Sequence, residues 1–155
     1  MDTVDKETRS RVMASVHSNG TKLEQRLIAI LREAGITNFV CNEKSLLGKP
    51  DIAFMDERVA VFLDSCFWHG CPKHLRRPNS NDTYWRAKID NNVRRDLRNR
   101  NKLRRMGWSA LRIWEHDLDK SALIIKKIRR ALDRSDAILA SGTDQIIRNQ
   151  TGEQQ

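Results

Sequence analysis

The sequence predicts an α/β fold in which helices cover both faces of a mixed central sheet, forming a three-layer sandwich. Short apolar runs typical of strands alternate with segments whose apolar residues recur at helical spacing. Two of the strand-like runs are joined by a tight turn, and a long helical segment crosses between this hairpin and the last strand. Sheets connected in this way bury their apolar surface under helices. With 155 residues the chain can form one domain with a core.

The first 20 residues are polar and basic, and they predict a short amphipathic helix with little apolar surface to anchor it. One interpretation of this segment is a frayed terminus. The other is a basic arm that closes on DNA and carries Met13 as an apolar probe of the minor groove.

A helix is then predicted from the capping box formed by Thr21 and Glu24 to the stop at Gly35. Its apolar stripe includes Leu27, Ile28 and Leu31. Glu24 either reaches back to the Thr21 amide or, because it lies beside this stripe, belongs to a catalytic neighbourhood. Both interpretations stay open.

Residues 39–42 predict a first strand, and residues 52–55 and 59–63 predict a hairpin. Pro50 suits a strand start because it has no amide hydrogen to donate to the ladder. Asp51 precedes the first hairpin strand and Asp64 follows the second, so an antiparallel pair brings both carboxylates to one edge of the sheet. Oxygen ligands of this kind suit Mg²⁺. We expect Asp51 as the principal ligand, with a further oxygen from the Leu63 carbonyl or the Asp64 side chain.

The segment after the hairpin predicts a metal site of a different kind. Cys66, Cys71 and His74 offer three ligands for tetrahedral Zn²⁺. A fourth could come from His116 or from His69. We assign His116, because two carboxylates and a metal still need a general base, and His69 can then serve as that base. Such a site is structural, because four protein ligands leave no open position. The alternative is two loose cysteines in a loop.

Residues 82–105 predict a long basic helix that ends at Gly107. Most of its arginines are expected to form a solvated face. Asn92 and Asp96 share one face of this helix, and Asp96 is a candidate to orient the second ring nitrogen of His69. Asn92 and Arg95 are candidate DNA contacts.

The last strand is predicted over residues 108–116, and Ser121 begins a final helix. From residue 135 the chain becomes polar, and residues 141–155 are expected to be disordered.

Charge and composition point to a nucleic-acid partner. The chain has 29 Lys and Arg against 20 Asp and Glu, a formal net charge of +9 and a pI near 9.9.

It has no apolar run long enough to span a bilayer and no signal-peptide pattern, so no membrane partner is expected. Three cysteines, two of them assigned to zinc, do not make a disulfide framework and suit a reducing cytoplasm. Cys41 is expected to be a small buried apolar residue.

Several motifs, in order and at family spacing over about residues 8–118, resemble the very-short-patch-repair (Vsr) mismatch endonucleases. They are Pro50-Asp51, VFLD at 61–64, CFWHGCPKH at 66–74, YWRAKIDNNVRRD at 84–96 and the stretch from Gly107 to His116. The resemblance implies a restriction-endonuclease-like catalytic domain over residues 21–134, a DNA-contacting arm before it and a polar tail after it.

The resemblance also implies an activity: Mg²⁺-dependent nicking of double-stranded DNA 5′ to the mispaired T of a T:G mismatch. This lesion arises from deaminated 5-methylcytosine, and mismatch-repair proteins and a DNA polymerase would act downstream, in association with the nucleoid. Phe67, Trp68 and Trp85 resemble the rings that the family inserts beside the mismatch. Without the resemblance, these rings are expected in the core. The chain departs from the best-known pattern at Asp64, where that pattern has His, and at His116, where it has Cys.

Two rival functions stay open. One is a restriction-like or homing nickase of the same fold that cuts matched DNA, and the other is a non-catalytic zinc module that binds DNA. A monomer is expected, because a T:G mismatch needs only one strand cut and no stretch stands out as a dimerisation surface.

Overall fold

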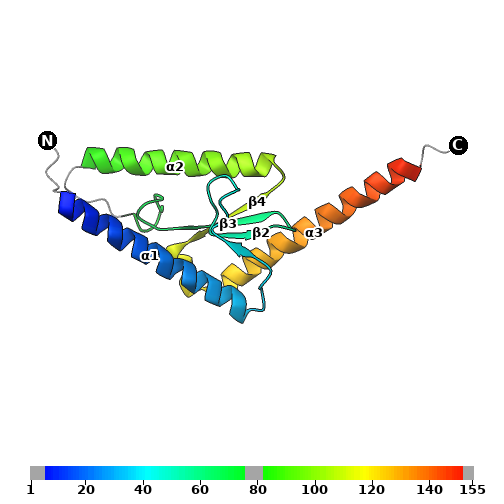
Figure 1. Cartoon of the computed structure of the whole chain (residues 1–155), viewed down its shortest axis with the longest axis horizontal. Helices are drawn as coiled ribbons and strands as arrows, with labels where there is room; N and C mark the ends of the chain where they lie inside the picture. The colour runs from blue at the N-terminus through cyan, green and yellow to red at the C-terminus, as the bar shows by residue number, and fades with distance from the viewer. Residues whose placement is uncertain (1–5, 76–81, 152–155) are drawn as a thin grey trace. The chain divides into compact units, whose positions relative to one another are not determined.

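The computed structural model describes the backbone of residues 6–75 and 82–151, and the side chains of residue 11 and residues 21–75 and 82–141. The element order confirms the predicted α/β class, with three helices and a four-stranded mixed sheet in the described chain (Figure 1). The elements are α1 (Lys6–Glu33), β1 (Val40–Cys41), β2 (Ile52–Phe54), β3 (Val59–Asp64), α2 (Asp82–Arg105), β4 (Ser109–Trp114), the 3₁₀ turn η1 (Glu115–Asp119) and α3 (Ser121–Thr151).

The strands form one sheet in the order β1-β2-β3-β4. β2 and β3 pair antiparallel, with Ile52 opposite Val61, which confirms the predicted hairpin. β4 runs parallel to β3, with Asp64 beside Trp114 at its far end. A parallel neighbour requires a crossover connection, and α2 provides it. The end of β3 and the turn after β4 therefore meet at the same edge of the sheet.

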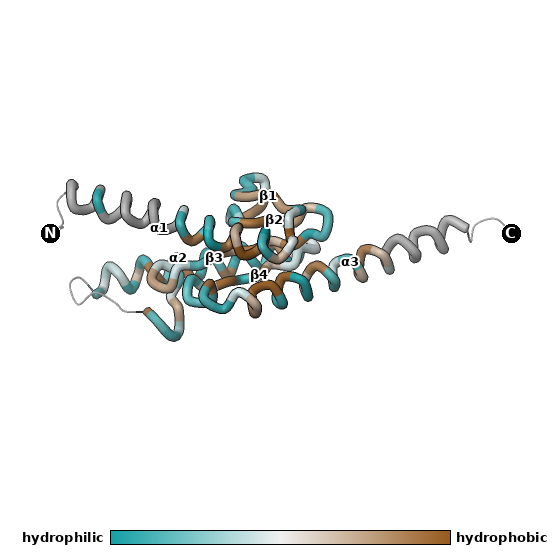
Figure 2. The backbone as a smooth tube through the Cα atoms, turned by 90° about the horizontal axis from the view of Figure 1, so that it is seen from below, coloured by the Kyte–Doolittle hydropathy of each residue, from teal (hydrophilic) through white to brown (hydrophobic). Residues whose placement is uncertain are grey.

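The two helices of the sheet unit cover opposite faces of the sheet. Ala60, Phe62 and Ala110 belong to one cluster with Leu103 of α2. Leu111 points to the other face and lines a groove together with α3 residues such as Ala131. Apolar residues gather in the strands and in the first half of α3 (Figure 2). The restriction-endonuclease-like assignment is finer than this topology and stays a prediction.

The chain divides into two compact units, residues 1–37 and residues 38–155. In the first, the predicted helix start at Thr21 is wrong, because α1 runs unbroken from Lys6 to Glu33. The residues before Thr21 include no proline, and an interior glycine such as Gly20 costs a helix only about 1 kcal/mol. α1 ends at Glu33, shortly before the predicted stop at Gly35, which has a φ of +74°.

In the second unit, two expectations are wrong. α3 continues to Thr151, although disorder was expected from residue 141. Helix formers such as Ala137 and Leu139 extend it without an intervening proline. Cys41 is exposed rather than buried, because it lies on β1, the two-residue edge strand of the sheet. Among the described residues, no helix has the length and apolar character needed to cross a membrane.

Candidate active site

A pocket of about 460 Å³ opens between α2 and the sheet face that α2 covers. Asp51 and Asp64 both line it, so the expected convergence of these two carboxylates is confirmed. Acidic and basic side chains line its wall, together with the backbone of the turn before β2. The lining residues are Gly48, Lys49, Asp51, Phe62, Leu63, Asp64, His69, Arg95, Asp96, Asn99 and Arg100.

A tight turn before β2 aims Asp51 at the pocket. Gly48 has a φ of +82°, and a Cβ there would lie 3.1 Å from the Phe62 ring and 3.2 Å from Asn99, so only glycine fits the turn comfortably. The Leu63 amide donates a 2.7 Å hydrogen bond to Asp51 Oδ2. Because the N–H and C=O of one strand residue point to the same side, the Leu63 carbonyl faces the same edge as Asp51. A carboxylate oxygen of Asp51 and the carbonyl oxygen of Leu63 fit the predicted site for a hard cation.

His69 lies in the loop after β3, with its Nδ1 atom 2.6 Å from Asp96 Oδ2 on α2. This contact is the one predicted from the helix face that Asp96 occupies. Burial alone would raise the pKa of Asp96, but the hydrogen bond and charge of His69, aided by Arg95, outweigh burial and lower that pKa. Asp96 is therefore ionised and can accept a hydrogen bond from the imidazole.

The buried Asp64 carboxylate has partners of its own. Its Oδ2 atom accepts a hydrogen bond from Arg112 Nε and lies 3.8 Å from Arg100 Nη1, while Oδ1 is 3.5 Å from His69 Nδ1. Neither Arg100 nor Arg112 was predicted as a site residue. Arg112 could have been found from the alternation of side chains along β4, because it falls on the same sheet face as Asp64. Arg100 belongs to a helix rich in arginine, and the sequence does not distinguish it from the other arginines of that helix.

The four predicted zinc ligands come together. One ligand atom from each of Cys66, Cys71, His74 and His116 lies within 4.8 Å of all the others. His116 Nδ1 is 3.2 Å from Cys66 Sγ and 3.8 Å from Cys71 Sγ, and His74 Nδ1 is 3.6 Å from Cys71 Sγ. Bond lengths of about 2.0–2.1 Å to nitrogen and 2.3 Å to sulfur give tetrahedral edges of about 3.3–3.8 Å, so the donor set fits zinc.

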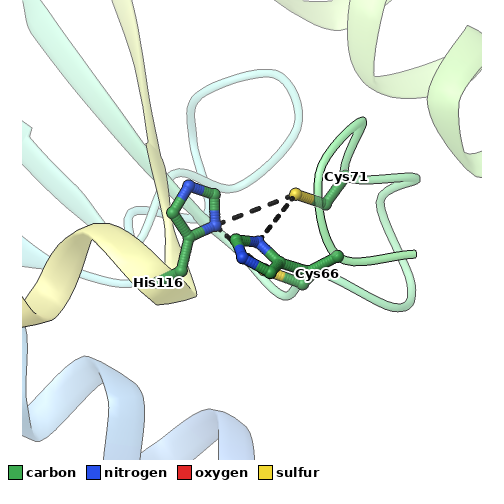
Figure 3. A group of neighbouring side chains, drawn as sticks. Cys66, Cys71 and His116 are labelled. Carbon is green, nitrogen blue, oxygen red and sulfur yellow. Dashed lines mark hydrogen bonds between the residues drawn. The ribbon is translucent and has the colours of Figure 1, made fainter. Parts of the chain in front are cut away.

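Figure 3 shows the elements that supply this donor set, with Cys66 and Cys71 on the loop after β3 and His116 turned toward them from η1. Burial raises the pKa of the metal-free Cys66 thiol to about 11. A bound cation would instead favour the thiolate. The identity of a bound ion stays a prediction.

Three large rings, two on the loop that carries His69 and one on α2, form a cluster. Their centroids are separated by 4.9 Å for Phe67 and Trp68, 5.6 Å for Phe67 and Trp85, and 5.7 Å for Trp68 and Trp85. All three rings are partly exposed, so they are not the fully buried core residues of the alternative interpretation. Asn92 Nδ2 donates a 3.1 Å hydrogen bond to the Trp68 carbonyl, which fixes the loop to α2.

Two predicted site residues belong to the first unit. Met13 lies in α1, outside the described side chains. Glu24 lies on the same helix and has intermediate burial. The parts that Met13 and Glu24 play in the site stay predictions.

Residues 1–75 match the family model described as DNA mismatch endonuclease Vsr. The DNA mismatch endonuclease Vsr of Escherichia coli strain K12 is 36% identical over 115 residues, covering 74% of this chain and 73% of the relative. The Type II nicking enzyme V.NmeDIP of Neisseria meningitidis serogroup C is 37% identical over 135 residues, covering 85% of this chain and 90% of the relative. The Type II nicking enzyme V.NaeI of Lentzea aerocolonigenes is 42% identical over 113 residues, covering 70% of this chain and 68% of the relative.

Proposed function

The chain belongs to the DNA mismatch endonuclease Vsr family and is a DNA endonuclease, and on that premise we propose that it nicks T:G mismatches in double-stranded DNA. The cut falls 5′ to the mispaired T, depends on Mg²⁺ and begins very short patch repair of deaminated 5-methylcytosine. The observation that carries the proposal is the pocket shared by Asp51, His69 and Asp96, in which His69 comes from the same loop as two of the three clustered rings.

Asp51 and the Leu63 carbonyl would hold Mg²⁺ at the mouth of β2. The ion, when bound, supplies positive charge against the scissile phosphate. Leu63 also restrains the Asp51 carboxylate through its amide hydrogen bond, so the second carboxylate oxygen can turn to the pocket. Asp64 was the other candidate ligand, but Arg112 and Arg100 already share its Oδ2 atom. We therefore favour the Leu63 carbonyl over the Asp64 side chain.

His69 acts as the general base. With Asp96 accepting a hydrogen bond at Nδ1, the neutral imidazole carries its proton on Nδ1 and leaves Nε2 free to take one from water. The water oxygen then attacks phosphorus, the bond from phosphorus to the leaving sugar oxygen breaks, and that oxygen takes a proton from solvent, so that one strand is nicked. Asp96 orients the ring and stabilises the imidazolium that forms. Asp64 is an accessory acid of the pocket.

Zinc at the Cys66, Cys71, His74 and His116 site would act on structure alone, because four protein ligands leave no open position for water. The site would tie the loop after β3 to η1. Since the same loop carries His69 and two of the three clustered rings, zinc would stabilise both the base and the recognition surface.

The ring cluster supplies mismatch recognition. Mispaired steps unstack cheaply, so Phe67, Trp68 and Trp85 can enter the duplex there at lower cost than at a matched step. Asn92 supports this surface through the Trp68 carbonyl, and Arg95 brings a positive charge to the pocket wall. Met13 would add an apolar contact from the N-terminal arm.

A second candidate function is nicking of matched DNA, favoured by the relatives named Type II nicking enzymes. The two functions share a pocket and differ in substrate, so a substrate comparison separates them. The zinc-module rival predicts DNA binding without cleavage.

The test uses end-labelled duplexes with T:G or T:A at the second position of CTAGG, in Mg²⁺ and in EDTA. A second pair of duplexes has randomised flanks around the same central pair, so that the unknown sequence context does not decide the outcome. A single cut on the T strand, only with T:G and only with Mg²⁺, is the expected result. Equal cutting of both duplexes would favour the matched-DNA nickase, and binding without any cut would favour the zinc module.

A further inference from the structure

The β4 side chain of Arg112 contacts both ends of the segment that presents His69. Its Nε atom donates to Asp64 Oδ2 at the start of that segment, and its Nη2 atom donates a 3.3 Å hydrogen bond to the His69 carbonyl at the end. Register places Arg112 beside Phe62, on the sheet face that carries Asp64. One guanidinium therefore bridges residues that are five positions apart in the chain and fixes the loop between them.

The guanidinium is itself held from a third direction. Its Cζ atom lies 4.0 Å from the centroid of the Trp114 ring, two residues along β4. The planar fork of arginine can stack on a ring and still donate along two directions, whereas the point charge of lysine cannot. The side chain is only 23% exposed, so solvent competes weakly for these bonds.

Arg112 also offsets a buried charge next to the proposed base. Asp64 is 4% exposed, and a buried carboxylate needs a partner. Asp64, His69 and Asp96 offer three atoms within 4.8 Å of one another that could hold a metal ion. With its carboxylate paired to Arg112, Asp64 is withheld from such a competing site, and His69 keeps Asp96 as its partner.

We propose that Arg112 is a positioning residue for the nicking pocket, acting through Asp64 and the His69 backbone without touching DNA. The inference rests on the proposed function, in which His69 is the base. It adds a residue to the site that neither the zinc ligands nor the metal-binding carboxylates include.

The test compares Arg112→Leu with a matched control, Arg104→Leu. Arg104 also donates a hydrogen bond to a backbone carbonyl, that of Ala110 at 3.1 Å, but it does not line the pocket. The single-turnover nicking rate at saturating DNA should fall about 100-fold in Arg112→Leu, the loss typical of a group displaced by about 1 Å. The DNA dissociation constant should stay within about threefold of the wild-type value, because Arg112 makes no contact with DNA in this account. The control Arg104→Leu should keep the wild-type nicking rate and the wild-type DNA dissociation constant.

Two further variants test whether the effect passes through Asp64. Adding Asp64→Asn to Arg112→Leu removes the carboxylate that has lost its Arg112 partner and should recover about tenfold of the lost rate, a coupling of the size seen between contacting charged residues. Arg112→Lys keeps the charge without the planar fork of the guanidinium. Its nicking rate should lie between those of wild type and Arg112→Leu. A double variant no faster than Arg112→Leu would overturn the role of Asp64, and a loss of DNA affinity that matches the loss of rate would mean that Arg112 touches DNA.

Hydrogen exchange gives a reading that does not depend on cleavage. Amides of residues 64–71 should exchange faster in Arg112→Leu than in wild type, while those of α2 stay unchanged. Unchanged exchange in residues 64–71 would refute the positioning role whatever substrate the enzyme cuts. If the wild type cuts matched and mismatched DNA equally, the T:G proposal fails but the comparison of variants still decides the role of Arg112.

Discussion

Gly70→Ala should destabilise the loop that carries His69 and lower the nicking rate with it. Gly70 directly follows His69 and has a φ of +66°, in the left-handed region that side chains disfavour. A Cβ at this position would lie 2.8 Å from Val93 Cγ2 and 3.4 Å from Ile89 Cγ2, both on α2. The loop therefore approaches the helix at the one residue that has no side chain to collide with it.

The expected cost has two parts. The left-handed backbone conformation costs an alanine about 1–2 kcal/mol. Forcing a methyl group against a packed helix costs about a further 1–3 kcal/mol, because the contact with Val93 is shorter than real Cβ atoms tolerate. The free energy of unfolding should therefore fall by about 2–5 kcal/mol. In a chain of this length each kcal/mol lowers Tm by about 2–4 °C.

The matched control is Gly35→Ala. Gly35 has a similar φ of +74°, but a Cβ there would meet nothing within 4 Å. This variant bears only the backbone cost, so the difference between the two variants in urea unfolding measures the collision with α2. Single-turnover nicking should fall at least about 100-fold in Gly70→Ala, because a shifted loop displaces His69, and should be unchanged in Gly35→Ala. Equal unfolding of the two variants, with wild-type nicking in both, would refute the packing of this loop against α2.

Three other substitutions probe separate parts of the site. Asp96→Asn should slow nicking about 100-fold or more with little change in DNA affinity, since the imidazole loses the carboxylate that orients it; a normal rate would exclude that role. Because the pKa of Asp96 is lowered in the folded protein, its ionisation stabilises the fold above the ordinary carboxyl pKa near 4, and this contribution disappears as pH falls through the lowered value. The stability difference between wild type and Asp96→Asn in urea should accordingly shrink as the pH falls below the ordinary carboxyl pKa near 4, and a difference independent of pH would contradict the assignment. Cys71→Ser should reduce the zinc content measured by metal analysis and lower Tm, whereas full zinc occupancy would remove Cys71 from the donor set. Trp68→Ala should lose preference for T:G over T:A duplex more than affinity for matched DNA, and an equal loss on both would argue against a wedge.

Local patterns predicted the elements that build the site. The hairpin followed from two apolar runs around a polar turn, and α2 has the predicted bounds of residues 82 and 105. The contact between His69 and Asp96 was also predictable, because Asp96 shares a helix face with Asn92 and the candidate base needed an orienting partner. For the hairpin and α2 the relevant pattern lies within one element or one short loop, whereas the contact of His69 with Asp96 follows from a helix face and a chemical requirement.

Other features depend on interactions that spacing does not encode. Arg112 contacts Asp64 because β4 pairs with β3 in one register, and a single-residue shift would have turned Arg112 to the other face. Cys41 is exposed because β1 lies at the sheet edge, a position that its composition does not reveal. The helix break expected at Thr21 failed because a capping box can also occur within a continuous helix. Tertiary context decided the positions of Arg112 and Cys41.

The most direct test of the proposed nicking site is Asp51→Asn. The side-chain amide oxygen can still accept the Leu63 N–H bond, so the turn keeps its hydrogen bond while the charge that would hold Mg²⁺ is lost. Single-turnover cleavage of T:G duplex should fall at least about 1,000-fold, in line with loss of Lewis-acid stabilisation, while the dissociation constant for the same duplex stays near that of wild type. A variant that still nicks T:G duplex at the wild-type rate in Mg²⁺ would contradict the assignment of this pocket as the nicking site.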